Sequence, residues 1–149
     1  MGAIFNDELK RLRGHFMEMG IDASEQIYQA TKAFTESDTV LAEQVLKTDP
    51  KINDEEINLE KEALKLMALQ QPVASDFRKI ISILKASSDI ERLGDYASHI
   101  ARAAIHLSDR EHNEEIEEQI EKMMMIVREM LERVLDAYVY TDEQKAYEV

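Results

Sequence analysis

Apolar residues recur every three or four positions along most of the chain, a spacing typical of long amphipathic helices. The first such stripe, over residues 5–34, predicts a helix that ends near Ser37. Ser37 and Asp38 are good N-cap residues, so a second helix is expected from there to about Gln70. Pro50 lies inside this second stripe and should kink the helix.

The second half of the chain predicts further helices. A third is expected over about Val73–Leu107 with an interruption at Gly94, and a fourth over the stripe of residues 116–138. The polar segment Ser108–Glu114 separates these two. Thr141 then opens the start of a fifth helix. The chain has only four Gly and two Pro, so it has few residues that could form the turns between short strands. The fold should therefore be all-α.

The helix lengths and the short connections indicate how the helices pack. Helices of about 30 residues would be about 45 Å long, and short connections make neighbouring helices antiparallel. We therefore expect an antiparallel three-helix bundle up to residue 108, followed by a fourth long helix and the start of a fifth.

Residues 104 positions apart in the chain resemble one another. The matched pairs are Phe16 and Ile120, Met19 and Met123, Ile27 and Leu131, Phe34 and Tyr138, Asp38 and Asp142, Ala42 and Ala146, and Val45 and Val149. We therefore expect one unit over residues 1–108 and an incomplete second copy over 109–149. A unit that cannot bury its apolar face alone needs a cover, so a missing segment or another chain should pack on the fourth helix. A chance match between two amphipathic helices is the alternative.

The acidic composition limits the possible partners. The chain carries 18 basic and 31 acidic residues, a formal net charge of −13. Such a field repels nucleic-acid phosphate and anionic lipid headgroups, so DNA binding is not expected. The same field attracts divalent cations and basic protein surfaces, although an acidic surface is most often only a solubility feature.

The sequence also limits targeting and metal chemistry. No apolar run has the length of a signal peptide or a membrane span. The absence of cysteine fits a reducing compartment and leaves carboxylate, amide and imidazole groups as the available metal ligands.

The third helix carries the sharpest candidate site. Glu91 and Asp95 are four residues apart, so their carboxylates project from one face, where they repel each other unless a cation neutralises them. Hard oxygen ligands suit magnesium, calcium, manganese or iron, and His99 could add an imidazole. The alternative is a solvated face screened by Arg92 and Arg102.

The second helix offers another half-site. Asp49 and Asn53 are also four residues apart, with Asp54 and Glu56 close by, and two antiparallel half-sites could converge. An Asn carbonyl oxygen can replace a carboxylate as a metal ligand, at a lower affinity. Asp49 also has a competing role as an N-cap to a helix that restarts at Pro50.

The patterns of several enzyme classes are missing. No Glu has a His three positions later, as a di-iron carboxylate site requires. The serines show neither a Gly-x-Ser-x-Gly elbow nor a nearby base, and the chain has no glycine-rich phosphate loop. A metal-dependent hydrolase, which would use a metal-bound water, lacks a convincing base. We therefore expect no enzyme.

Two motifs resemble the signature of the PhoU family. The first is the run Gln-Gln-Pro-Val-Ala-Ser-Asp-Phe-Arg at 70–78, and the second is Asp-Ile-Glu-Arg-Leu-Gly-Asp at 89–95. The two motifs stand at the family's spacing, and similarity extends back through the second helix, so that the resemblance covers essentially the whole chain. It implies a tandem pair of three-helix bundles that binds multinuclear metal through E(D)-x-x-x-D motifs.

The resemblance also implies which residues bind metal. The E(D)-x-x-x-D motif falls on Glu91 and Asp95, and on Asp49 and Asn53, where Asn53 departs from the strict pattern. Iron, manganese, magnesium or zinc is the expected cofactor. His99 stands where the family often has Asn, so an imidazole ligand there is a separate hypothesis.

The function implied by the resemblance is negative regulation of phosphate uptake and of phosphate-starvation signalling. Family members act between the phosphate ABC transporter, with its ATPase, and a sensor histidine kinase. This places the chain in the cytoplasm, at the membrane only through protein partners. The exposed stripe of the fourth helix predicts either a homo-oligomer or docking of this helix onto the first bundle. The alternative function is a metal-free helical protein-interaction module.

Overall fold

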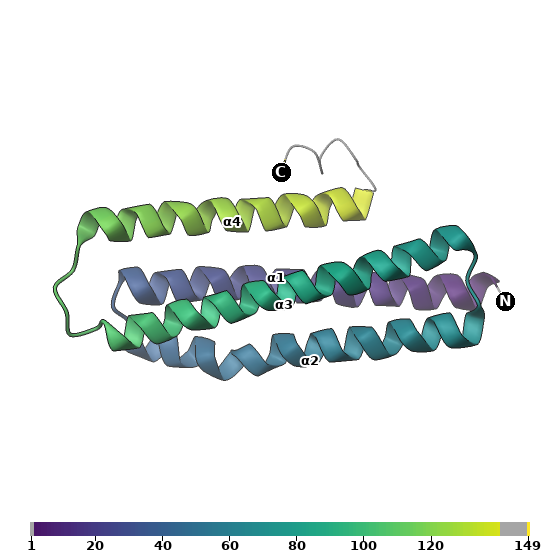
Figure 1. The fold of residues 1–149 in the computed structure, drawn as a ribbon, viewed down its shortest axis with the longest axis horizontal. Coiled ribbons are helices and arrows are strands. Elements are labelled where there is room, and N and C mark those ends of the chain that lie inside the picture. Colours follow the sequence, from purple (N-terminus) through teal and green to yellow (C-terminus); the bar gives the residue numbers. More distant parts are fainter. Residues whose placement is uncertain (1, 141–148) are drawn as a thin grey trace.

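The computed structural model describes residues 2–140 and 149, and within them it forms four long helices (Figure 1). Helix α1 spans Gly2–Thr35, α2 spans Thr39–Gln70, α3 spans Ala74–His106 and α4 spans Glu114–Tyr140. The all-α prediction is confirmed, and the predicted helix boundaries agree with these within a few residues. The fifth helix expected from Thr141 lies outside the described residues. None of the helices in the described ranges is long and apolar enough to cross a membrane.

The first three helices form the bundle and α4 is added to one side of it. α1, α2 and α3 each pack against the other two, whereas α4 packs against α1 alone among the described helices. Figure 1 shows the four helices running along a common long axis, with α4 on the side of α1 away from α2. The short connections at 36–38 and 71–73 make α1, α2 and α3 alternate in direction.

The boundary between α1 and α2 follows from two adjacent residues. Ser37 takes a positive φ of 52°, which ends α1 and turns the chain. Asp38 is then the N-cap of α2, because its side chain accepts a hydrogen bond from the backbone N–H of Leu41 at 3.0 Å. α2 continues through Pro50 as one helix and changes direction in its first half (Figure 1).

Gly94 does not interrupt α3, and the prediction of a break there is wrong. The helix is continuous across this residue, which is buried against Ile52 of α2. A Cβ at Gly94 would lie only 3.2 Å from Ile52 Cδ1. The missing side chain therefore lets α2 and α3 approach closely, and this packing offsets the roughly 1 kcal/mol of helix propensity that a glycine costs.

The core follows the predicted apolar stripes. Its largest fully buried side chains come from all three helices of the bundle, and they include Leu12, Phe16 and Met19 of α1, Ile52 and Leu59 of α2, and Ile80 and Ile83 of α3. Small residues fill the closest approaches, since the buried alanines on these helices are nearly inaccessible. The core therefore extends along the whole length of the bundle.

α4 packs antiparallel on α1, as contacts spread along the two helices show. Phe16 meets Tyr138 edge-on with ring centroids 5.0 Å apart, and a Cβ at Gly20 would lie 2.6 Å from Leu135 Cδ1. Arg128 Nε donates to Ser24 Oγ at 3.2 Å, and the Arg128 guanidinium lies 4.8 Å from the centre of the Tyr28 ring. Residue numbers rise along α1 as they fall along α4.

Candidate metal centre

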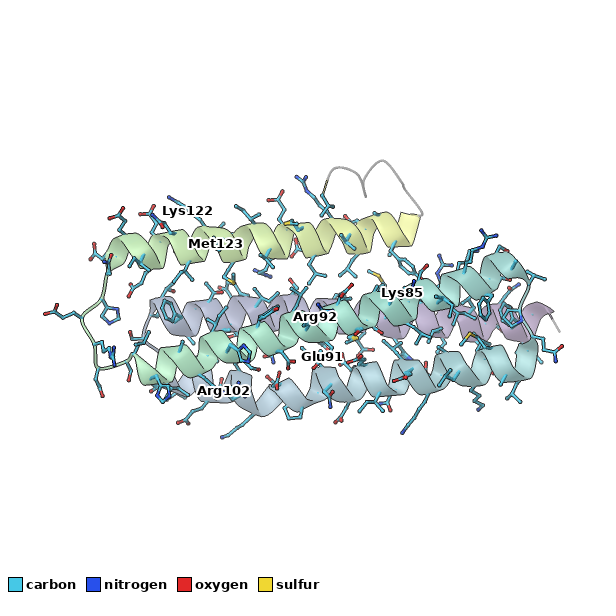
Figure 2. All side chains as sticks on the ribbon, in the orientation of Figure 1. Lys85, Glu91, Arg92, Arg102, Lys122 and Met123 are labelled. Atoms are coloured by element: carbon cyan, nitrogen blue, oxygen red, sulfur yellow. The ribbon has the colours of Figure 1, made fainter. Side chains whose placement is uncertain are left out.

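Glu91 is the centre of an acidic cluster between α2 and α3. Its side chain is half-buried on the side of α3 that faces α2 (Figure 2). Burial raises the pKa of Glu91 above its usual value, and the negative charges of Asp95, Glu56 and Asp49 raise it further. Carboxylates from two helices therefore act on one group.

The pKa of Glu56, on α2, is raised in a similar way. Burial raises its pKa first, followed by the charges of Glu60 on its own helix and of Asp95 on α3. We call Asp49, Glu56, Glu91 and Asp95 the acidic cluster. Of the predicted residues, Asp95 and Asp49 thus both act on Glu91 through their charge.

The other predicted residues stand differently. Asn53 lies one turn from Asp49 on α2 and is exposed, as is Asp54 beside it. His99 is exposed on α3, and its ring packs edge-on against Tyr96 with centroids 6.2 Å apart. Arg92, a proposed screening partner of the carboxylates, instead donates to Asp89 Oδ1 at 2.9 Å.

The acidic cluster has the donor chemistry of a cation site without a closed coordination sphere. Within the described part of the chain, no three His, Asp or Glu side chains converge closely enough to hold a metal ion. Besides burial, neighbouring negative charges nevertheless raise the pKa of Glu91 and of Glu56. A hard divalent or trivalent cation would reverse that repulsion, because oxygen ligands of negative charge are the ones it prefers. The residues therefore fit a metal in chemical type.

A second acidic pair, between α1 and α2, was not found from the sequence. Lys51 Nζ lies 3.1 Å from Asp22 Oδ2 and 3.8 Å from Glu55 Oε1. Burial raises the pKa of Glu55 to about 8, and a hydrogen bond with Asp22 and its charge add to this. Glu55 falls between Ile52 and Leu59, both buried at helical spacing, and this position inside the apolar stripe was the available signal.

The pH dependence of stability tests this pair. The pKa of Glu55 is higher in the folded state than in the unfolded chain, so between pH 4.5 and about 8 the folded state holds the extra proton. Stability through this group is therefore greatest below pH 4.5 and falls as the pH rises to 8. In Glu55→Gln the fall should be absent, so the variant should gain stability relative to the wild type between pH 5 and pH 8, by about 1 kcal/mol because solvent screens this partly exposed carboxyl group. Urea denaturation at pH 5, 7 and 9 measures this, and parallel profiles would contradict it.

The connection between α1 and α2 and the connection between α3 and α4 lie at the same end of the bundle. A serine, a histidine and a carboxylate link them. Ser37 Oγ lies 3.0 Å from His112 Nε2, and His112 Nδ1 lies 2.6 Å from Glu117 Oε1. This link was not predicted from the sequence, because Ser37 lies 75 positions before His112. The backbone N–H groups of Ser37 and Asp38 donate to carbonyls of α1, so they are not free to stabilise an oxyanion. The chain of hydrogen bonds thus ties the start of α4 to the turn before α2.

Comparison with known proteins gives consistent results. The PhoU domain model matches residues 16–104. The PhoU homologue of the phosphate-specific transport system from Clostridium acetobutylicum is 39% identical over 147 residues, which are 98% of this chain and 67% of that protein. The corresponding homologue from Pseudomonas aeruginosa is 37% identical, with 97% and 60% covered, and the Escherichia coli accessory protein PhoU is 31% identical, with 97% and 60% covered.

Solved structures agree with these sequence matches. The crystal structure of PhoU from Pseudomonas aeruginosa superposes with a TM-score of 0.92 at 37% identity, over 97% of this chain and 69% of that one. The phosphate transport system regulatory protein PhoU from Streptococcus pneumoniae gives 0.89 at 32% identity, with 97% and 67% covered. The chain therefore spans about 60–69% of the length of these relatives.

Proposed function

The chain belongs to the PhoU family, and from this premise we propose that it is a negative regulator of phosphate uptake and phosphate-starvation signalling. It is a homologue of the phosphate-specific transport accessory proteins, which are regulatory proteins and not enzymes. The observation that carries the proposal is the match over 97% of the chain in both sequence and fold. Its proposed partners are the ATPase of the phosphate ABC transporter and a sensor histidine kinase, which it would meet in the cytoplasm.

The acidic cluster is the proposed metal-binding part of this regulator. Glu91 and Asp95 of α3, with Asp49 and Asn53 of α2, would hold iron, manganese, magnesium or zinc. Burial and, after it, the neighbouring carboxylates raise the pKa of Glu91, and this supports the proposal because a bound cation would remove the repulsion between the carboxylates. A metal would supply positive charge that binds α2 to α3. The residues' own part is to carry hard oxygen donors on two rigid helices.

The uncovered face of α4 supports the proposal of an incomplete second repeat over residues 109–149. Four of its exposed apolar positions correspond, 104 residues earlier, to buried positions of α1: Ile116 to Leu12, Met123 to Met19, Met130 to Gln26 and Val134 to Ala30. Figure 2 shows Met123 on α4. A face of this kind should be covered by a further segment of the repeat or by a second chain, so self-association is part of the proposal.

Repression in a bacterium that lacks its own PhoU protein tests the function. The chain should lower expression of a phosphate-starvation reporter, such as secreted alkaline phosphatase, in phosphate-rich medium. An unchanged reporter despite normal protein levels would contradict the proposal for the chain. The Glu91→Gln/Asp95→Asn variant distinguishes a metal-binding regulator from a metal-free interaction module. If the chain is the metal-free module, the variant should repress as well as the wild type does.

A further inference from the structure

One end of the bundle differs from the rest of the molecule in its charge and in the apolar side chains that it exposes. The start of α1, the end of α2 and the start of α3 meet there, next to the connection of residues 71–73 (Figure 1). Residues of α1 and α2 lie side by side at this end, since Glu8 and Arg11 line a shallow pocket together with Glu62 and Lys65. We call the outer twelve residues of each helix, 2–13, 59–70 and 74–85, together with the connection of residues 71–73, the basic tip.

The basic tip presents apolar side chains to solvent. Leu69 and Val73, on either side of the turn, are each 67% exposed. Ile4 at the start of α1 is 62% exposed and Phe77 in the first turn of α3 is 44% exposed. These side chains project from helix ends and from a tight connection, so they can meet a flat surface together. Exposed apolar groups that gather in one place mark a contact site.

The charge of the tip is opposite to that of the chain. The three segments contain eight basic and five acidic residues, a net charge of +3, while the rest of the chain carries ten basic and 26 acidic residues, a net charge of −16. Basic residues of all three helices are exposed here: Lys10 and Arg11 of α1, Lys61 and Lys65 of α2, and Arg78, Lys79 and Lys85 of α3. Figure 2 shows Lys85 on the half of α3 that leads to this end. The N-termini of α1 and α3 add partial positive charge.

The strong negative charge elsewhere does not oppose an end-on approach to an anionic surface. A helix of about 33 residues is about 50 Å long, whereas the Debye length at physiological salt is about 8 Å. When the tip touches such a surface, most acidic residues lie several Debye lengths away. The charge near the surface therefore decides the interaction, and the charge of the whole chain does not.

We propose that the basic tip binds directly to an anionic lipid bilayer, with Leu69, Val73 and Phe77 inserted among the headgroups and with Lys65, Arg78 and Lys79, the basic residues nearest the end, paired with lipid phosphates. Each basic residue near such a surface adds about fivefold to the partition coefficient, and exposed apolar residues anchor the contact. Such a contact would hold the bundle perpendicular to the membrane. It goes beyond the proposed regulatory function, and its test requires neither transporter nor kinase.

Vesicle sedimentation tests the proposal with purified chain. At physiological salt, the wild type should sediment with vesicles of phosphatidylglycerol and phosphatidylcholine and should stay in solution with phosphatidylcholine alone. The variant Lys65→Glu/Arg78→Glu/Lys79→Glu should lose about tenfold or more in partition coefficient. Leu69→Ser/Val73→Ser should also weaken binding, without loss of helix content, because both residues are exposed.

A matched variant keeps the test specific. Lys47→Glu/Arg102→Glu/Lys122→Glu makes the same change in net charge at exposed residues away from the tip, so it should bind within about twofold of the wild type. Equal losses in both triple variants, or no sedimentation of the wild type, would overturn the proposal. If the wild type does not sediment, the tip would instead be a contact site for an acidic protein partner, which the vesicles do not contain.

Discussion

Replacing Glu91 by Gln together with Asp95 by Asn should remove bound metal from protein purified without chelators. Both changes keep the size and polarity of the side chains, but they remove two of the four negative charges in the acidic cluster. Hard cations depend on charged oxygen ligands, so we expect occupancy to fall from stoichiometric to background. Elemental analysis for iron, manganese, magnesium and zinc measures this directly.

The control for this experiment is another acidic pair with the same spacing. Glu114 and Glu118 are four residues apart on α4, both exposed, and Glu118 is paired with Lys122 at 2.7 Å. Glu114→Gln/Glu118→Gln should keep the metal. Negligible metal in all three proteins would contradict the metal centre and favour the metal-free interaction module.

Phe16→Ala should cost about 3–5 kcal/mol of the free energy of unfolding, the largest effect we expect on stability. The Phe16 side chain is 2% exposed, and its ring lies against Tyr138 in the contact between α1 and α4. The substitution leaves a cavity that rigid helices fill only in part. Urea denaturation followed by circular dichroism measures the loss.

Ile21 provides the control on the same helix. It is 61% exposed, so Ile21→Ala should change stability by less than about 0.5 kcal/mol. A double-mutant cycle with Tyr138→Ala isolates the contact, and an edge-on aromatic pair should show about 0.5–1.5 kcal/mol of coupling. A coupling near zero would mean that α4 does not rest on Phe16 in solution.

The fold could be predicted because its signals are local. The apolar stripes fix the helices, and Asp38 caps α2 where the sequence indicated. The packing role of Gly94 could not be predicted from the local sequence, since it depends on contact with Ile52 of a different helix. The place of α4 was equally out of reach: a glycine at 20 and a leucine at 135 have no relation until the helices pack.

The candidate site could be predicted in part for the same reason. Spacing puts Glu91 and Asp95 on one face, but only the packing of α2 against α3 adds Glu56 to them. The pair of Asp22 and Glu55 was missed because its two members lie 33 positions apart, on different helices. Pairing across helices depends on their rotation and register, which the apolar stripe determines only roughly.

Because α4 touches only α1 among the described helices, it can separate without breaking the contacts of α2 and α3 with α1. Its backbone amides should then exchange with solvent through a partial opening that requires less free energy than global unfolding, while the slowest amides of the first three helices report the stability of the whole bundle. The molecule thus has two cooperative units of different stability. When α4 separates, solvent reaches the surface of α1 around the small residues Gly20 and Ser24.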